Sequence, residues 1–222
     1  MLLTGTLFNQ VTADQQQARM AADYILTARG TPGLPLSIIP QVLSSPDVAA
    51  ATATIPASVM IRQGDKLRDY QAQGLLYANS DPVLELGVQE GSLRHLTDDA
   101  IAVSREIADL QKWKLGDKVD LWLSDGKPTT LRMVAIYTLS RGFGDFVLPG
   151  KLVVAHSLNG LASSVFVQNQ SGGDVSAAAN SLAALEAKWP MLDVSSRGTA
   201  VDKTANAISS QQAAFYLLVG IT

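Results

Sequence analysis

The sequence contains no cysteine and only two histidines among its 222 residues. The absence of cysteine excludes disulfides, thiolate metal sites and a cysteine nucleophile, and it leaves the redox compartment open. Aromatic residues make up 6 % of the chain and charged residues 17 %. The 17 basic residues oppose 20 acidic ones without forming a basic run, which argues against a nucleic-acid-binding surface. An apolar fraction of 47 % is still enough for the core of one large domain or two small ones.

Long hydrophobic runs are also missing, since a bilayer-spanning helix needs about 20 apolar residues. Both ends of the sequence are nonetheless apolar and resemble spanning helices that stop at a membrane surface. We therefore expect residues 1–12 to be the end of one transmembrane helix and residues 206–222 the start of another. The alternative is a C-terminal helix that packs on the domain's own core, which would also shield the apolar run at 213–222 from solvent.

Two strand–helix–strand patterns lie toward opposite ends of the sequence. The first has a strand at 21–27, a short helix and an alternating strand at 48–61. The second has a strand at 164–168, an amphipathic helix at 175–189 and a short strand at 192–194. Two similar patterns around a different middle predict a split domain with an insertion.

The segment between these patterns is mostly β in character. Ser104 follows a short apolar strand and is placed to cap a helix. Residues 119–123 alternate, and 124–127 form a hairpin signal before a return strand at 131–137, which is apolar enough to be buried on both faces. The apolar run at 150–155 is expected to be a last strand. Several short strands around one helix predict a small β-barrel or sandwich.

Four short motifs follow one another in this middle segment. They are Gly-Ser-Leu at 91–93, Ile-Ala-Val-Ser at 101–104 before a helix, Gly-Asp-Lys-Val at 116–119, and the Asp-Gly hairpin at 125–126. In this order, and between apolar ends, the sequence resembles the extracytoplasmic core domain of FtsX/MacB-like ABC-transporter permeases. The resemblance covers roughly residues 10–215.

The resemblance implies an α+β fold with a split, porter-like α/β sandwich subdomain and an inserted small β-rich, barrel-like subdomain. Terminal helices would lead from this domain to membrane spans. The porter-like subdomain would consist of residues 13–62 and 163–205, and the insert of residues 63–162. The strands near Tyr24 and Phe166 should then share one sheet.

The same resemblance implies a function and a set of partners. The chain would be the extracytoplasmic domain of a permease that couples ATPase-driven motion to export, extraction or sensing of a substrate outside the membrane. Its partners would be a cytoplasmic ATP-binding subunit, a second permease copy and the membrane at both termini, with no nucleic acid. The chain departs from the family pattern at Ala135, where a glycine is usual. A ligand-sensing ectodomain of a two-span signalling receptor is the alternative function.

No residue pattern in the sequence predicts catalysis, a metal or a cofactor. His95 with Asp98 and Asp99 offers too few donors in register for a metal site. The pair His156 and Ser157 lacks the glycine pattern of a nucleophile elbow, and the phosphate-binding motif GxxxxGK[ST] does not occur. We therefore expect a domain that is not an enzyme and that binds neither metal nor nucleotide.

The segment 140–146 is the one stretch that resembles an interaction loop. It places Arg141, Phe143 and Phe146 close to glycines, between two expected strands. Arginine beside exposed aromatic residues is typical of interfaces. We therefore take Arg141, Phe143 and Phe146 as candidate partner or substrate contacts. The alternative is that both phenylalanines fold back and cap the β-rich subdomain.

Overall fold

The computed structural model describes residues 22–77, 83–139, 143–157, 159–170 and 175–196. These residues form ten strands, four α-helices and one short 3₁₀ helix, a mixed content that agrees with the fold class expected from the sequence. The strands are β1 (Tyr24–Ala28), β2 (Val48–Gln63), β3 (Lys66–Tyr77), β4 (Val88–Gly91), β5 (Ala100–Ser104), β6 (Lys118–Trp122), β7 (Pro128–Tyr137), β8 (Phe146–Pro149), β9 (Ser164–Asn169) and β10 (Leu192–Ser196). The helices are α2 (Ile38–Leu43), η1 (Leu93–His95), α3 (Arg105–Gln111), α4 (Gly150–Ala155) and α5 (Val175–Lys188).

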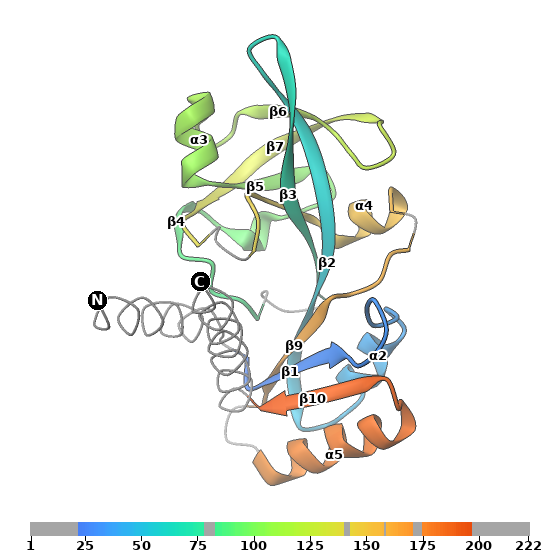
Figure 1. Cartoon of the computed structure of the whole chain (residues 1–222). Coiled ribbons are helices and arrows are strands. Elements are labelled where there is room, and N and C mark those ends of the chain that lie inside the picture. Colours follow the sequence, from blue (N-terminus) through green and yellow to red (C-terminus); the bar gives the residue numbers. More distant parts are fainter. Residues whose placement is uncertain (1–21, 78–82, 140–142, 158, 171–174, 197–222) are drawn as a thin grey trace, which may run out of the picture.

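All ten strands belong to one sheet, and β2 runs from the end that carries β1, β9 and β10 to the end that carries β6 and β7, where β3 pairs back along it (Figure 1). At one end, β10, β1, β9 and β2 are successive antiparallel neighbours. Ile25 of β1 lies opposite Phe166 of β9, so the prediction that these two strands share a sheet is confirmed. The helices α2 and α5 pack on these four strands through one cluster that includes Ile38, Leu182 and Val165.

At the other end, the strand pairings form a closed circuit. From β2 they pass through β3, β8, β5, β7 and β6 and return to β2. These six strands share a buried cluster, here called the ring cluster, which also receives Ile107 of α3 and Val153 of α4. Because Ile55, Val59 and Ile61 belong to it, the second half of β2 contributes to this end of the molecule.

A second cluster, here called the outer cluster, lies on the other face of β5, β7 and β8. Successive residues of a strand point to opposite faces, so Val103 and Phe146 enter the ring cluster whereas Ala102 and Val147 enter the outer cluster. All five residues of β5 and residues 133–137 of β7 are buried. The two-sided burial predicted for the return strand is therefore confirmed.

The apolar run at 150–155 is a helix, α4, and the strand precedes it at Phe146–Pro149. The expectation of a strand there was wrong, because a short apolar run fits a buried strand and a buried helix equally well. Tertiary contact decides between them. Gly150 lies so close to β3 that an added Cβ would stand 2.7 Å from the carbonyl oxygen of Leu75, and this approach seats α4 on the strand.

Other expected elements agree with the structure. Ser104 caps α3, since its hydroxyl accepts a hydrogen bond from the backbone N–H of Ile107 at 3.3 Å. Pro56 lies within β2, between the residues that pair with β9 and those that pair with β6, where a missing N–H is tolerated. The terminal helices expected at 1–12 and 206–222 lie outside the described residues. Among the described residues, no helix is both long enough and apolar enough to cross a membrane.

Candidate functional site

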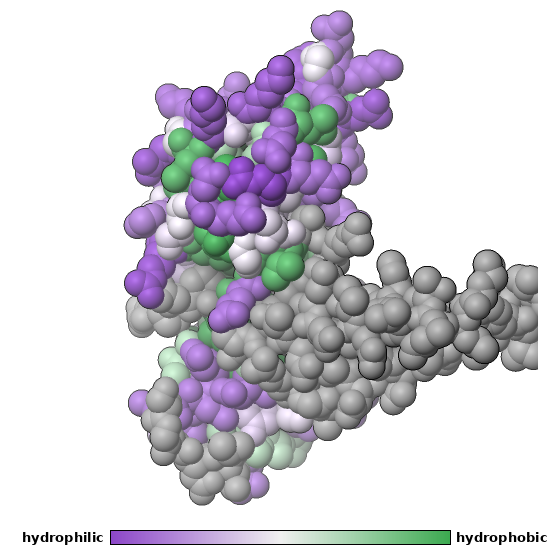
Figure 2. Space-filling view, turned by 90° about the vertical axis from the view of Figure 1, so that its left-hand side faces the viewer, coloured by the Kyte–Doolittle hydropathy of each residue, from purple (hydrophilic) through white to green (hydrophobic). Residues whose placement is uncertain are grey.

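The side of the molecule that carries α3 and β4 is mostly hydrophilic, with separate hydrophobic patches between the polar side chains (Figure 2). The segment 83–96 covers the outer cluster on this side, and its buried leucines form part of that cluster. It is held beside β7, since the backbone N–H groups of Thr138 and Leu139 donate to the carbonyls of Gly87 and Leu86, each at 3.1 Å. The segment therefore has a fixed position against the sheet.

An apolar trough with a volume of about 620 Å³ follows this segment. Leu84, Leu86 and Leu93 are largely buried in its floor, and Val88, which is 37 % exposed, stands in its wall with Leu139. The other residues that line it are Glu85, Gly87, Gly91, Ser92 and Arg94. A trough of this size lies within the range of small-molecule sites, about 300–1,000 Å³.

A second cavity of about 580 Å³, here called the basic pocket, adjoins the trough. Its lining includes Arg94, His95 and Arg132, together with the apolar side chains of Leu115 and Met133. Gly91 and Arg94 line both cavities, so the trough and the basic pocket share a boundary at these residues. The η1 turn places Arg94 there, since the Ser92 hydroxyl accepts the backbone N–H of Arg94 at 3.2 Å.

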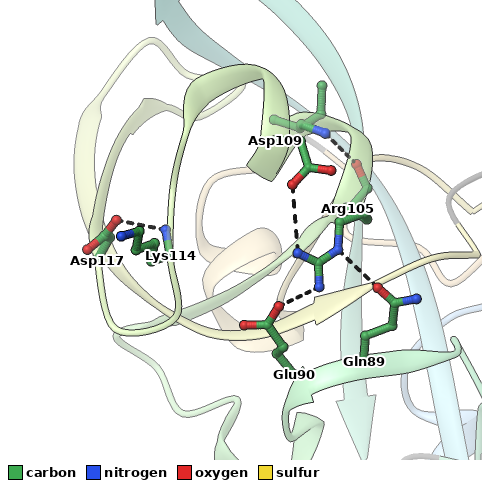
Figure 3. Close-up of polar contacts among 8 residues, drawn as sticks. Gln89, Glu90, Arg105, Asp109, Lys114 and Asp117 are labelled. Atoms are coloured by element: carbon green, nitrogen blue, oxygen red, sulfur yellow. Dashed lines mark hydrogen bonds and ion pairs between the residues drawn. The ribbon is translucent and has the colours of Figure 1, made fainter.

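Arg105 ties β4 to the start of α3 (Figure 3). Its guanidinium forms an ion pair with Glu90, donates to the Gln89 side-chain oxygen at 3.0 Å, and lies 3.7 Å from Asp109. The hydrogen bond and charge of Glu90 raise the pKa of Arg105 further above its usual value. A single exposed ion pair stabilises little, but this network of three acceptors orients β4 beside the two cavities.

The interaction loop predicted at 140–146 does not lie wholly at the surface. Phe146 is completely buried and makes an edge-to-face contact with Tyr70, the ring centroids being 5.7 Å apart. The expectation that Phe146 is a contact residue is therefore wrong. Phe146 is a core residue, because the alternation of β8 points its side chain into the ring cluster. Phe143 is half-buried against the outer cluster. Arg141 lies outside the described residues.

Buried polar groups fix the residues that follow this loop. The Tyr137 hydroxyl donates to the Gly144 carbonyl at 2.7 Å, and burial raises the pKa of Tyr137 well above its usual value. The Ser104 hydroxyl donates to the Asp145 carboxylate at 3.1 Å. Burial raises the pKa of Asp145, although this hydrogen bond opposes the shift. The cap of α3 and the start of β8 are thus held together.

The two histidines do not share a site. His95 lines the basic pocket, whereas His156 follows α4, and its Nδ1 is hydrogen-bonded to the Asp125 carboxylate at 2.8 Å. The Ser157 hydroxyl accepts backbone N–H groups of Asn159 and Gly160, so it caps a turn. Among the described residues, no three side chains of the metal-binding types gather into a group that could hold an ion.

The contact between His156 and Asp125 predicts a pH dependence. The hydrogen bond from His156, aided by contacts to Lys127, lowers the pKa of Asp125 from 3.8 to about 2. A carboxyl group whose pKa is lower in the folded state stabilises the fold above its unfolded pKa, and loses that contribution as the pH falls through the folded value. Asp125→Asn should therefore lower the melting temperature at pH 5, and the difference from the wild type should close between about pH 4 and pH 2.

Thermal unfolding at several pH values measures this difference. Asp98→Asn removes the same charge from an exposed side chain and serves as the control. A deficit of Asp125→Asn that stays constant from pH 5 to pH 2 would contradict the prediction.

No protein-family model and no curated protein matches this sequence. Its structure, however, matches that of the periplasmic region of MacB from Actinobacillus actinomycetemcomitans, with a TM-score of 0.61 over 84 % of this chain and 94 % of that one, at 12 % identity. The chain has the MacB periplasmic fold. The extracellular domain of YknZ, a noncanonic ABC-type transporter from Gram-positive bacteria, is also similar, with a TM-score of 0.56 over 77 % of this chain and 98 % of that one, at 17 % identity.

The MacB-like fold agrees with the resemblance drawn from the motifs at 91–93, 101–104, 116–119 and 125–126. In the structure, these motifs are the end of β4 with η1, the passage from β5 into α3, the start of β6, and the β6–β7 turn. Ala135, where a glycine is usual, lies opposite Gly91 and is completely buried in the outer cluster. The methyl group of Ala135 therefore packs within the outer cluster.

Sequence reasoning missed Arg94, Arg132 and the trough. Arg94 directly follows the Gly-Ser-Leu motif, so that motif was a usable signal for it. Arg132 lies in a strand about 40 residues later and reaches the same cavity only because β7 pairs with β4. The pairing of distant strands cannot be read from local periodicity.

Proposed function

We propose that this chain is the extracytoplasmic domain of an ABC-transporter permease and is itself not an enzyme. In this role it would couple motion driven by a cytoplasmic ATP-binding subunit to export, extraction or sensing of a substrate outside the membrane. The observation that carries the proposal is the fold, which matches the periplasmic region of MacB over 84 % of this chain and 94 % of that one. The order of the four motifs supports it independently.

We further infer a division into two subdomains. The closed circuit of six strands supports a barrel-like insert formed mainly by residues 63–162, although the circuit also needs the second half of β2, which pairs with β6 at Met60 and Ile61. The sheet shared by β1, β9 and β10 supports a split α/β unit built from residues 13–62 and 163–205. A second permease copy and membrane at both termini complete the proposed assembly.

The absence of cysteine allows a clean test of the location. A single cysteine is introduced as Asp65→Cys, at the exposed turn between β2 and β3, in the natural membrane protein with any other cysteines replaced. A membrane-impermeant maleimide added to spheroplasts should label this variant without permeabilisation. Ile101→Cys, at a completely buried position, is the control and should react only after denaturation. Labelling of Asp65→Cys only after the membrane is opened would contradict the proposal.

The coupling is tested in the same cells. The tagged membrane protein should copurify with a subunit that carries an ATP-binding GxxxxGK[ST] motif, and a variant of that subunit's lysine should abolish transport. Copurification with a kinase or another signalling protein would instead favour the receptor ectodomain.

A further inference from the structure

The trough and the basic pocket differ in chemistry but share a boundary. The floor of the trough consists of leucines that are 2–8 % exposed. Val88 and Leu139 are apolar residues in its wall. The basic pocket is lined by Arg94, Arg132 and His95. A ligand that fills both cavities must therefore have an apolar part and an anionic part.

At the boundary that the two cavities share, Gly91 packs directly against the backbone of β7. Its φ is +75°, and a Cβ at this position would stand 2.0 Å from the Val134 carbonyl oxygen and 2.7 Å from Leu115 Cδ1. The backbone approach of β4 to β7 thus excludes a side chain at the boundary. Arg94 lines both cavities at the same place, so it can meet the polar end of a molecule whose apolar end lies in the trough.

Acidic groups near the site set its charge. A hydrogen bond from the Thr97 hydroxyl at 2.6 Å is the main cause that lowers the pKa of Asp99, and the charge of Arg132 lowers it further. Glu85 lines the trough but not the basic pocket. Among the described residues, the lining of the basic pocket includes two arginines and no acidic side chain.

We propose that the trough and the basic pocket together bind a single-chain amphiphile with an anionic phosphate or carboxylate headgroup. The chain lies along Leu84, Leu86 and Val88, and the headgroup lies between Arg94 and Arg132. Arginine suits such a headgroup because its planar guanidinium can make two parallel hydrogen bonds to phosphate or carboxylate oxygens. The proposal rests on the proposed function, for which it names the substrate class.

The test is calorimetric binding of lysophosphatidylglycerol to the full 222-residue chain, below the micellar concentration of the lipid. Lysophosphatidylcholine with the same acyl chain should bind at least tenfold more weakly, because its headgroup has no net charge. Glycerol phosphate, which has the headgroup but no chain, should also bind at least tenfold more weakly. Equal affinity for either of these and for lysophosphatidylglycerol would overturn the proposal, as would no binding of lysophosphatidylglycerol.

Two pairs of matched variants locate the site. Arg132→Gln should weaken lysophosphatidylglycerol binding about tenfold, whereas Arg68→Gln on the distant β2–β3 hairpin should not change it. Val88→Asn should weaken binding of both lysolipids, whereas Leu67→Asn, at a hairpin position that is 46 % exposed, should not. Equal losses in the site and hairpin variants would overturn the assignment. Melting temperatures check that all four variants fold.

These measurements use the isolated chain and need no ATP-binding subunit. Failure to bind the amphiphile would therefore overturn the substrate class and leave the permease function to be decided by maleimide labelling and copurification. If Asp65→Cys is labelled only after the membrane is opened but the isolated chain still binds the amphiphile, the permease function is overturned and the ligand class is not.

Discussion

Replacement of Gly91 by alanine should destabilise the folded chain by about 3 kcal/mol or more, because among the described glycines Gly91 is the one at which an added Cβ would meet the closest neighbour. The added Cβ would stand 2.0 Å from the Val134 carbonyl oxygen, which is backbone and cannot turn away. The hydrogen bond from the Ser92 N–H to the same carbonyl, at 3.1 Å, would have to lengthen or break. Urea unfolding, with the slope checked against the wild type, measures the loss.

Gly64→Ala is the matched control. Gly64 also has a positive φ, +60°, but no atom lies within 4 Å of an added Cβ. Its replacement should therefore lower the free energy of unfolding by only about 1–2 kcal/mol, because alanine disfavours the left-handed backbone conformation. If the two alanine variants unfold at the same urea concentration, the close approach of β4 to β7 is wrong.

Replacement of Phe146 by alanine should lower the free energy of unfolding by about 3–5 kcal/mol, because it removes a completely buried ring and leaves a cavity. The edge-to-face contact with Tyr70 would be lost as well. The measurement is again equilibrium urea unfolding, and the free energies of the two proteins are compared at equal slopes.

Phe143→Ala provides the comparison within the same loop. Its ring is partly exposed beside the outer cluster, so its loss should cost less than that of Phe146, about 1–2.5 kcal/mol. Equal losses at the two positions would show that Phe146 is not the core residue described above. If Phe143→Ala abolishes transport with no more than this modest loss of stability, the Phe143 ring belongs to a contact surface.

The local elements could be predicted where one physical signal acts alone. Ser104 before an amphipathic run specifies a helix start, and the Asp-Gly pair at 125–126 specifies a hairpin, because both depend on backbone groups within a few residues. The run at 150–155 failed for the opposite reason. Its conformation depends on packing against β3, which lies more than 70 residues earlier in the chain.

The candidate site shows the same limit. The loop at 140–146 was chosen for its composition, but composition does not tell which face of a strand a residue occupies, and β8 turns Phe146 inward. Arg94 and Arg132 are ordinary surface residues in the sequence. They become a site only where β4 and β7 come together beside the trough.

The sequence by itself determined that the chain contains both helices and strands, in which order they follow one another around the hairpin, and that the chain resembles permease ectodomains. These depend on hydrophobic periodicity, capping and turn chemistry, which act over a few residues. The tertiary structure alone decided that the six strands close into a circuit, that Gly91 must lack a side chain, and that two arginines face one cavity. Each of these depends on at least one contact between segments that lie tens of residues apart, and such contacts leave no periodic trace in the chain.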